Sequence, residues 1–486
     1  MIDATRDLGA PPGCAGRSGR AAAAPERWSL PLAITLIAGV CLLLGIVGAD
    51  ARWLAALGRE IGPAGRIPAG LPFAAAPTRH WHNVTVLAEL GFWRLESTLG
   101  DRGLLLAQAL AVAIAFTSLA RDARRAGAAD EQTASACLIA ALGAVASLVI
   151  ARSQLFSIAL FPVLLALLRS DARRGSRRIW MVVPLLALWS NLHGGVLVGL
   201  AVALVYLLGD RLRRSPVETV LLVVLCTSAL CVNPAGVHAL AYYHAVLSGA
   251  AAQHGQGMWG PLSPTSPSGA LTIVAGLMLL WRVRRNRPRA WELVVTVLLA
   301  VMTIHAARSG IWLLFWLVAP AALGGRPGPP WRRRTVVLAA ASLAVLTLAA
   351  VRGPARGGAD RQVLAQVIHL AGRSPILADD IPAEQIALAG GRVWVSDPID
   401  AFSPRMQLAY LEWMAGDRAG LAAVGPAVRV VLAGAGSPEA ALMRRDRSFR
   451  AITRTGGFEL FERVVGGRDE PARARVTLAA RTARRT

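Results

Sequence analysis

Long apolar runs recur along the chain up to residue 351, and short bursts of arginine separate them. The first run extends from Trp28 to Gly48. A helix needs about 20 mostly apolar residues to cross the hydrocarbon core of a bilayer, and backbone groups inside a bilayer must find their hydrogen-bond partners within the protein. The pattern therefore predicts an α-helical polytopic membrane protein.

The composition excludes two other classes of protein. Charged residues make up 17% of the 486 residues and hydrophobic residues 55%, whereas soluble domains have about 25% charged residues. The formal net charge of +23 does not indicate nucleic-acid binding, because the arginines lie in short bursts and not in one patch. Such bursts are typical of cytoplasmic loops, and we predict no nucleic-acid partner.

The arginine bursts also predict an orientation for the chain. Residues 1–27 are rich in arginine and form a cytoplasmic N-terminal tail, so the first apolar run is a retained helix and not a cleaved signal peptide. Alternation of the loops gives a transmembrane domain over residues 28–352 with about eleven spans. The expected spans are 28–48, 103–120, 133–151, 154–168, a pair that turns outside near His193, 217–232, 270–281, 291–306, 310–323 and 336–351.

Two regions outside the bilayer have structure of their own. The first outside loop, residues 49–102, contains two amphipathic segments, 52–61 and 84–95, which we expect on the membrane surface. After a linker at 353–360, residues 361–464 predict a small extracytoplasmic α/β domain, and residues 465–486 form a disordered basic tail. Its expected strands are 375–378, 393–396, 428–432 and an edge strand at 458–463, in a small parallel sheet, with helices at 361–371, 383–389, 404–414 and 438–443.

Two acidic residues of the outside loop are candidates for catalysis. Asp50 lies where the first span ends, and a carboxylate there is suited to act as a general base for an acceptor hydroxyl or to help hold a divalent cation. Glu89, in the second amphipathic segment, is the next candidate. In the alternative interpretation Asp50 only ends its helix in water and Glu89 lies on a solvated face. The metal, if there is one, stays unknown.

Polar clusters at four expected outer turns are candidates for substrate binding. Polar groups at membrane depth are costly unless they have partners or face a cavity. Arginine suits a phosphate through bidentate contacts, and tryptophan suits a sugar ring; snorkelling arginines and a turn histidine are the alternatives. The candidate substrate-binding residues are Arg152, Gln154, Trp189, Asn191, His193, His305 and Arg308.

These residues carry a resemblance to a family. Asp50, Arg152-Ser153-Gln154, Trp189-Ser190-Asn191-Leu192-His193-Gly194, Asn233-Pro234 and Ala307-Arg308 occur in an order that resembles the GT-C superfamily of glycosyltransferases, including its protein mannosyltransferase type, and an uncharacterised bacterial group similar to it. The resemblance implies a protein of the bacterial cytoplasmic membrane that transfers a sugar from a polyprenyl-phosphate donor to an acceptor on the outer face. It also implies that Asp50 is the base and that Arg152 and Arg308 bind the donor phosphate.

Three classes of function are therefore compared. The first is the glycosyltransferase. The second is an inactive GT-C-like protein that serves as a scaffold or lipid-binding protein in cell-envelope assembly. The third is a transporter, for which we expect internal repeats and charges near the middle of the membrane. The centres of the apolar runs lack Asp, Glu and Lys, which makes the transporter the weakest of the three.

Overall fold

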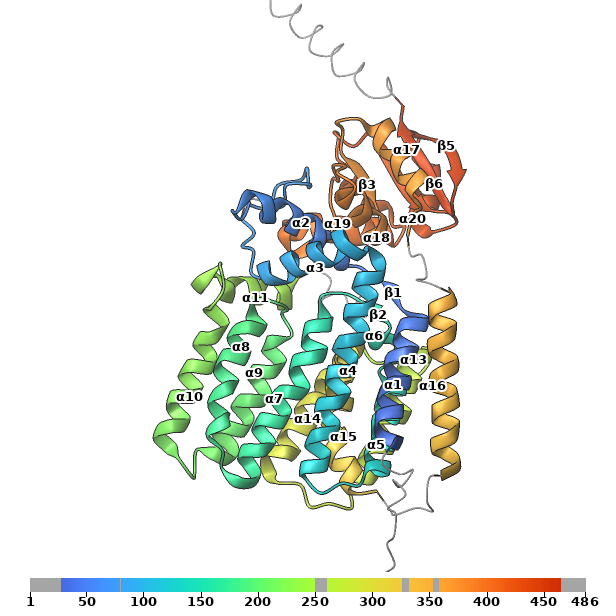
Figure 1. The fold of residues 1–486 in the computed structure, drawn as a ribbon. Helices are drawn as coiled ribbons and strands as arrows, with labels where there is room; N and C mark the ends of the chain where they lie inside the picture. The colour runs from blue at the N-terminus through green and yellow to red at the C-terminus, as the bar shows by residue number, and fades with distance from the viewer. Residues whose placement is uncertain (1–27, 79, 250–259, 326–331, 353–357, 465–486) are drawn as a thin grey trace, which may run out of the picture.

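The computed structural model describes residues 28–78, 80–249, 260–325, 332–352 and 358–464. Figure 1 shows a bundle of helices with an α/β domain, coloured orange and red, above one end of it, and with α2 and α3 between the two parts. We call this the domain-side end of the bundle. The terminal tails expected at 1–27 and 465–486, and most of the linker, lie outside the described residues.

The bundle contains a helix at each of the expected spans. Its buried core includes large aromatic side chains such as Trp316, Phe116 and Phe315, whereas its outer surface exposes apolar ones such as Leu110, Val217 and Leu277. The main helices are α1 (Ser29–Leu44), α4 (Asp101–Arg125), α5 (Asp130–Gly143), α7 (Gln154–Arg174), α8 (Val182–Ser190), α9 (Val196–Tyr206), α10 (Pro216–Ser228), α13 (Pro267–Val283), α14 (Ala290–His305), α15 (Gly310–Leu323) and α16 (Arg332–Arg352).

By length and apolar character, fewer of the described helices qualify as membrane spans than the sequence predicts. Among the described helices, 3 are long and apolar enough to cross a membrane, or up to 4 if a bent pair is one span. That pair joins 216–231 to 236–248 with a bend of 94°, and α11 (Ala239–Ser248) lies in its second half at the domain-side end (Figure 1). Several other apolar helices are shorter, so the count of about eleven spans stays a prediction.

Buried ion pairs join helices at the opposite end of the bundle. Asp122 of α4 accepts hydrogen bonds from Arg169 and Arg173 of α7 at 3.0 and 2.9 Å. Arg211 lies 3.0 Å from the carboxylate of Asp171. A buried charge is tolerated when a partner and further hydrogen bonds compensate its desolvation. These pairs therefore fix the arginine-rich end of the bundle, which the sequence predicts to be cytoplasmic.

The C-terminal domain has a mixed sheet, and the sequence prediction of a parallel one was wrong. The order is β3 (Ile376–Ala378), β4 (Val430–Gly434), β6 (Phe458–Arg463) and β5 (Phe449–Thr455), and only β3 and β4 are parallel. The strand β6 is not at an edge, because β5 pairs with it in a hairpin that the sequence reading missed. The helices lie where expected: α17 (Arg361–Ala371), α18 (Asp380–Leu388), α19 (Pro404–Met414) and α20 (Pro438–Arg445).

The expected strand at 393–396 is absent from the sheet. Val393 forms only isolated parallel bridges, one to Ile376 and one to Ala74 of the outside loop. The N–H of Ala75 also donates to the carbonyl oxygen of Val393 at 2.8 Å. The outside loop thus occupies the position that a neighbouring strand would take, and it docks onto the α/β domain.

The two amphipathic segments form α2 (Ala51–Ala64) and α3 (Val86–Leu99), which pack closely against each other. A Cβ atom at Gly58 would lie 2.1 Å from the carbonyl oxygen of Glu89. Only glycine therefore allows the two helices this approach. On its other side α2 contacts α18 of the α/β domain, so α2 lies at the junction of the two parts of the chain.

Candidate active site

A short parallel ladder determines where Asp50 lies. β1 (Ile46–Val47) follows α1 and pairs with β2 (Ile150–Ala151), which directly precedes Arg152. The N–H of Gly48 continues the ladder by donating to the carbonyl oxygen of Ala151 at 3.1 Å. Two segments distant in sequence therefore leave the bundle side by side. The sequence predicts a span over residues 133–151, and it does not predict the strand β2 at the end of that range.

Asp50 begins α2 in an unusual backbone conformation. Its φ of 79° is left-handed, and it is the one non-glycine residue with positive φ in the described part of the chain. Its side chain makes no capping hydrogen bond to the helix; its Oδ1 instead accepts one from Nε1 of Trp53 at 3.3 Å. The carboxylate is half-buried and thus retains acceptor capacity for another group.

Two arginines lie near this carboxylate. Arg152 donates to Oε1 of Gln154 at 2.5 Å, while its Nε is buried without a hydrogen-bond partner. Arg308 lies in η7 (Ala307–Ser309), a turn held by a bond from the N–H of Ala307 to the carbonyl oxygen of Gly260 at 2.9 Å. The two guanidinium groups repel each other and both are attracted to Asp50. An anion bound between them would relieve this repulsion.

His193 lies beside the two arginines in a defined tautomer. Its Nδ1 accepts from the N–H of Gly195 at 3.0 Å and lies 2.6 Å from Oγ of Ser157. A backbone N–H can only donate, so Nδ1 carries no proton and Nε2 carries it. Ser157 then donates to His193 and accepts from Nε1 of Trp189 at 2.7 Å. The Nε2–H group is therefore available as a neutral hydrogen-bond donor next to Arg152 and Arg308, whose charges act on the ring.

The α/β domain contributes carboxylates that the sequence reading did not select. Burial raises the pKa of Glu384, Asp380 and Asp397, and the negative charge of Asp50 raises each of them further. Asp400 accepts from Nε1 of Trp81 at 3.0 Å, and burial raises its pKa to about 6. In the sequence Asp380, Asp397 and Asp400 follow expected strands, where carboxylates can bind a sugar or a cation but a capping or turn role is the more common one.

Four candidates from the sequence do not present their side chains as a binding or catalytic group in this arrangement. Glu89 is fully buried, accepts from Nδ2 of Asn83 at 2.7 Å, and has a pKa raised to about 8 by burial. Trp189 is fully buried and packs edge-on against Phe161, so its ring is not open to a sugar. Asn191 bonds the carbonyl oxygens of Ala187 and Val232, and His305 is exposed at the end of α14.

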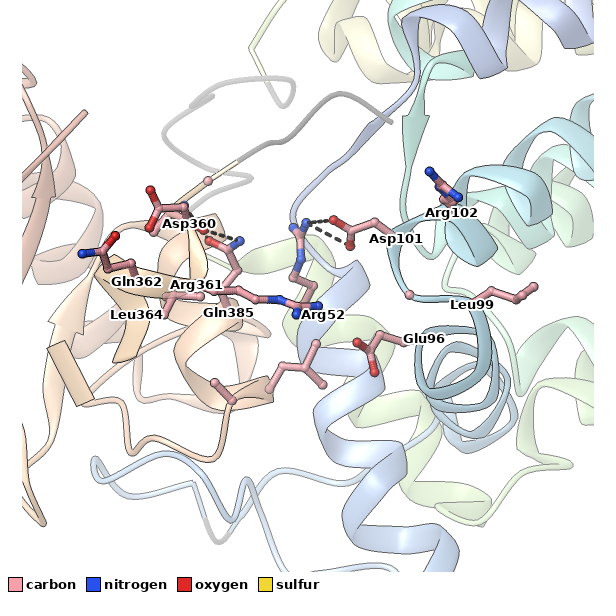
Figure 2. A pocket seen from close by; sticks show the side chains of 15 residues that line it. Arg52, Glu96, Leu99, Asp101, Arg102, Asp360, Arg361, Gln362, Leu364 and Gln385 are labelled. Atoms are coloured by element: carbon pink, nitrogen blue, oxygen red, sulfur yellow. Dashed lines mark hydrogen bonds and ion pairs between the residues drawn. The ribbon is translucent and has the colours of Figure 1, made fainter. Parts of the chain in front are cut away.

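A cavity of about 970 Å³ lies beside α2, between the bundle and the α/β domain. Figure 2 shows Arg52, Glu96 and Asp101 on one side of it and Arg361 and Gln385 on the other. Arg52 is held by Asp101, with NH2 at 3.2 and 3.1 Å from the two carboxylate oxygens. Arg52 lines the cavity and lies two residues from Asp50 in the sequence, whereas Asp50 itself is not among the lining residues.

The acidic residues near Asp50 do not form a metal centre in the described part of the chain. No group of at least 3 His, Cys, Asp or Glu side chains there is placed to hold a metal ion together. Several of these carboxylates are instead engaged by backbone or indole N–H groups. The divalent cation that the sequence left open therefore has no built set of ligands among these residues.

No protein-family model matches the chain, and no curated protein matches it in sequence. Among solved structures, ArnT from Cupriavidus metallidurans bound to undecaprenyl phosphate aligns with a TM-score of 0.50 and 14% identity, covering 90% of this chain and 98% of that chain. The arabinofuranosyltransferase AftD from Mycobacteria gives a TM-score of 0.46 and 15% identity, covering 90% of this chain and 41% of that chain.

ArnT is a GT-C glycosyltransferase, and at this identity the likeness concerns the fold. The chain thus has a GT-C-like fold, as the order of its polar motifs had predicted. Together with the apolar helices it identifies a membrane-embedded protein.

Proposed function

We propose that the protein transfers a sugar from a polyprenyl-phosphate donor to an acceptor hydroxyl at the outer face of the bacterial cytoplasmic membrane. The observation that carries the proposal is the group of Asp50, Arg152 and Arg308 at the domain-side end. The strands β1 and β2 bring Asp50 beside Arg152, and the charge of Arg308, in η7, interacts with both residues. A general base and a phosphate site are the two elements that such a transfer requires.

The reaction follows from these roles. The carboxylate of Asp50 takes the proton of the acceptor hydroxyl as its oxygen attacks the anomeric carbon of the donor sugar. The bond from that carbon to the phosphate oxygen breaks, and the polyprenyl phosphate leaves with the electron pair. Arg152 and Arg308 stabilise the charge that develops on the leaving phosphate, and Nε2–H of His193 donates a further hydrogen bond to it. Attack opposite the leaving group inverts the configuration.

The cavity between the two domains supplies room for the acceptor. Its lining carries Arg52, Arg102 and Arg361 together with Glu96, Asp101 and Asp360, so its formal charge is balanced. Such a lining suits a neutral, hydroxyl-rich molecule better than a strongly charged one. The acceptor would reach Asp50 along α2.

Binding of undecaprenyl phosphate to the protein in nanodiscs tests the donor site. We expect Arg152→Gln and Arg308→Gln each to weaken binding at least about tenfold, since each removes a charge-assisted contact. The Arg152→Lys variant should also bind undecaprenyl phosphate more weakly, because lysine cannot make bidentate contacts to a phosphate. Arg174→Gln, an exposed arginine at the other end of the bundle, is the control.

Two results would contradict this assignment. Equal binding by the parent and both site variants would show that Arg152 and Arg308 do not bind the phosphate. Tight binding that needs both arginines, with no transfer from any polyprenyl-phosphate sugar, would favour the alternative of an inactive lipid-binding protein in envelope assembly.

A further inference from the structure

The side chain of Glu384 crosses from the α/β domain to the first turn of α2. Its Oε1 accepts from the N–H of Asp50 at 2.7 Å, and its Oε2 accepts from the N–H groups of Arg52 and Trp53 at 3.0 and 3.3 Å. The side chain is fully buried. One carboxylate from a distant part of the sequence therefore binds three backbone donors at the start of this helix.

This contact replaces the cap that α2 would otherwise need. The N–H groups in the first turn of a helix have no acceptor within the helix, and the side chain of the N-cap residue usually serves them. Asp50 is the N-cap of α2 but makes no such bond. Because Glu384 serves these N–H groups, the carboxylate of Asp50 remains free for another role.

The contact also holds Asp50 in a costly conformation. A left-handed backbone is unfavourable for a residue with a side chain, and residues in this conformation persist when their surroundings hold them. Rotation of Asp50 to negative φ would move its N–H and break the 2.7 Å bond to Glu384. The neighbouring ladder holds the chain at Gly48, so the backbone of Asp50 is fixed from both sides.

Glu384 has a second carboxyl group as its neighbour. Asp397 makes a side-chain hydrogen bond to Glu384, and burial together with the nearby carboxylates raises the pKa of Asp397 well above its ordinary value. Burial and the charge of Asp50 raise the pKa of Glu384 to about 8, although the N–H groups of Asp50 and Arg52 and the charge of Arg52 act in the opposite direction. The two carboxyl groups therefore share a hydrogen bond while both oxygens of Glu384 accept from N–H groups of α2.

From this geometry we propose that Glu384 is a positioning residue for Asp50. It fixes the backbone of Asp50 so that the carboxylate stays beside Arg152 and Arg308, and it makes the reactive arrangement depend on docking of the α/β domain. This inference rests on the proposed function of Asp50.

The test compares Glu384→Gln and Glu384→Asp with the parent protein in nanodiscs. The side-chain amide of Gln has one acceptor oxygen, so it can accept from Asp50 or from Arg52 and Trp53 but not from both. Asp keeps both carboxyl oxygens, but its side chain is too short to reach the N–H groups. Glu459→Gln is the matched control, because Glu459 is a buried carboxylate of the same domain that pairs with Arg444. Three quantities are measured: amide hydrogen exchange over residues 50–53, binding of undecaprenyl phosphate, and kcat for transfer from an undecaprenyl-phosphate-linked sugar.

Both Glu384 variants should raise amide exchange over residues 50–53 and lower kcat, each at least about tenfold, because N–H groups in the first turn of α2 lose their acceptor. Binding of undecaprenyl phosphate should stay within about twofold, since the arginine pair is intact. The control should match the parent in all three quantities.

Faster exchange with unchanged kcat would overturn the positioning role, and so would unchanged exchange. A loss of lipid binding equal to the loss of kcat would also overturn it, because it would indicate a general structural defect. If the parent shows no turnover with any donor, the proposed function fails and the catalytic part of this inference fails with it. The exchange measurement then still decides whether Glu384 holds the backbone of Asp50.

Discussion

The N–H of Gly48 donates to the carbonyl oxygen of Ala151 at 3.1 Å, and this bond aligns the segment that ends in Asp50 with the segment that begins at Arg152. The close approach of the two segments leaves little space for a side chain at Gly48. A Cβ atom at Gly48 would lie 2.3 Å from Cγ2 of Ile150, so a larger residue at this position would force Ile150 of the ladder to shift. Backbone pairing therefore fixes the relative position of the two segments from which the side chains of Asp50 and Arg152 extend.

A side chain at Gly48 should consequently impair transfer. We expect Gly48→Val to lower kcat at least about tenfold, because a displacement of about 1 Å near the reacting groups is enough for a loss of that order. The control is Gly276→Ala in α13, where an added Cβ meets nothing within 4 Å. Equal kcat values for Gly48→Val and the parent would show that the ladder does not position Asp50.

Ser157 links Trp189 to His193, and its removal should affect both. Ser157→Ala leaves the buried Nε1–H of Trp189 without an acceptor, which costs about 1–3 kcal/mol. His193 loses one of its two fixed contacts, so undecaprenyl phosphate should bind a few-fold more weakly. The melting temperature in detergent and the binding constant measure the two effects. An unchanged melting temperature would exclude the linked arrangement; Ser97→Ala, an exposed site, is the control.

Glu89 should make stability depend on pH. Burial raises its pKa to about 8 in the folded protein, whereas an unfolded chain has about 4.3. The folded state therefore binds more protons, and stability falls as the pH rises from about 4 towards 8. Glu89→Gln cannot ionise and should raise the melting temperature relative to the parent at pH 8.5 more than at pH 5. A difference that is the same at both pH values would contradict the raised pKa.

Asp122 should contribute to the stability of the protein but not to binding of undecaprenyl phosphate. Asp122→Asn leaves the buried Arg169 without a charged partner, and breaking a buried pair in this way costs about 3–5 kcal/mol. Asp130→Asn removes the partner of the exposed Arg124 and should cost about 0–1 kcal/mol. Both variants should bind undecaprenyl phosphate like the parent where they remain folded. Similar melting temperatures for the two variants would show that the Asp122 pairs do not fix that end of the bundle.

The helical part of the fold could be predicted from the sequence because apolar length is a direct signal. Helices occur at every expected span, and α17 and α19 have the expected bounds. The errors in the small sheet have physical causes. Residues 449–455 are mostly exposed and lack the alternation that marks a strand. Val393 lies in an apolar segment that makes only isolated bridges, to Ile376 of β3 on one side and to Ala74 of the outside loop on the other.

The candidate site could be predicted only in part. Asp50, Arg152, His193 and Arg308 stood out as polar residues at the ends of apolar runs, and their charges interact in the structure. Glu384 gave no signal, because one glutamate in a short helix is usually solvated. Its role comes from a contact between segments far apart in the sequence, which no local pattern shows.

The most direct test of the central claim is single-turnover transfer by the parent and by Asp50→Asn, with an undecaprenyl-phosphate-linked sugar bound at saturation. General-base catalysis contributes about 10²–10⁴-fold to a rate. We therefore predict that Asp50→Asn binds the donor as the parent does and transfers at least about a hundredfold more slowly. Equal single-turnover rates for the two proteins would contradict the assignment of Asp50 as the base.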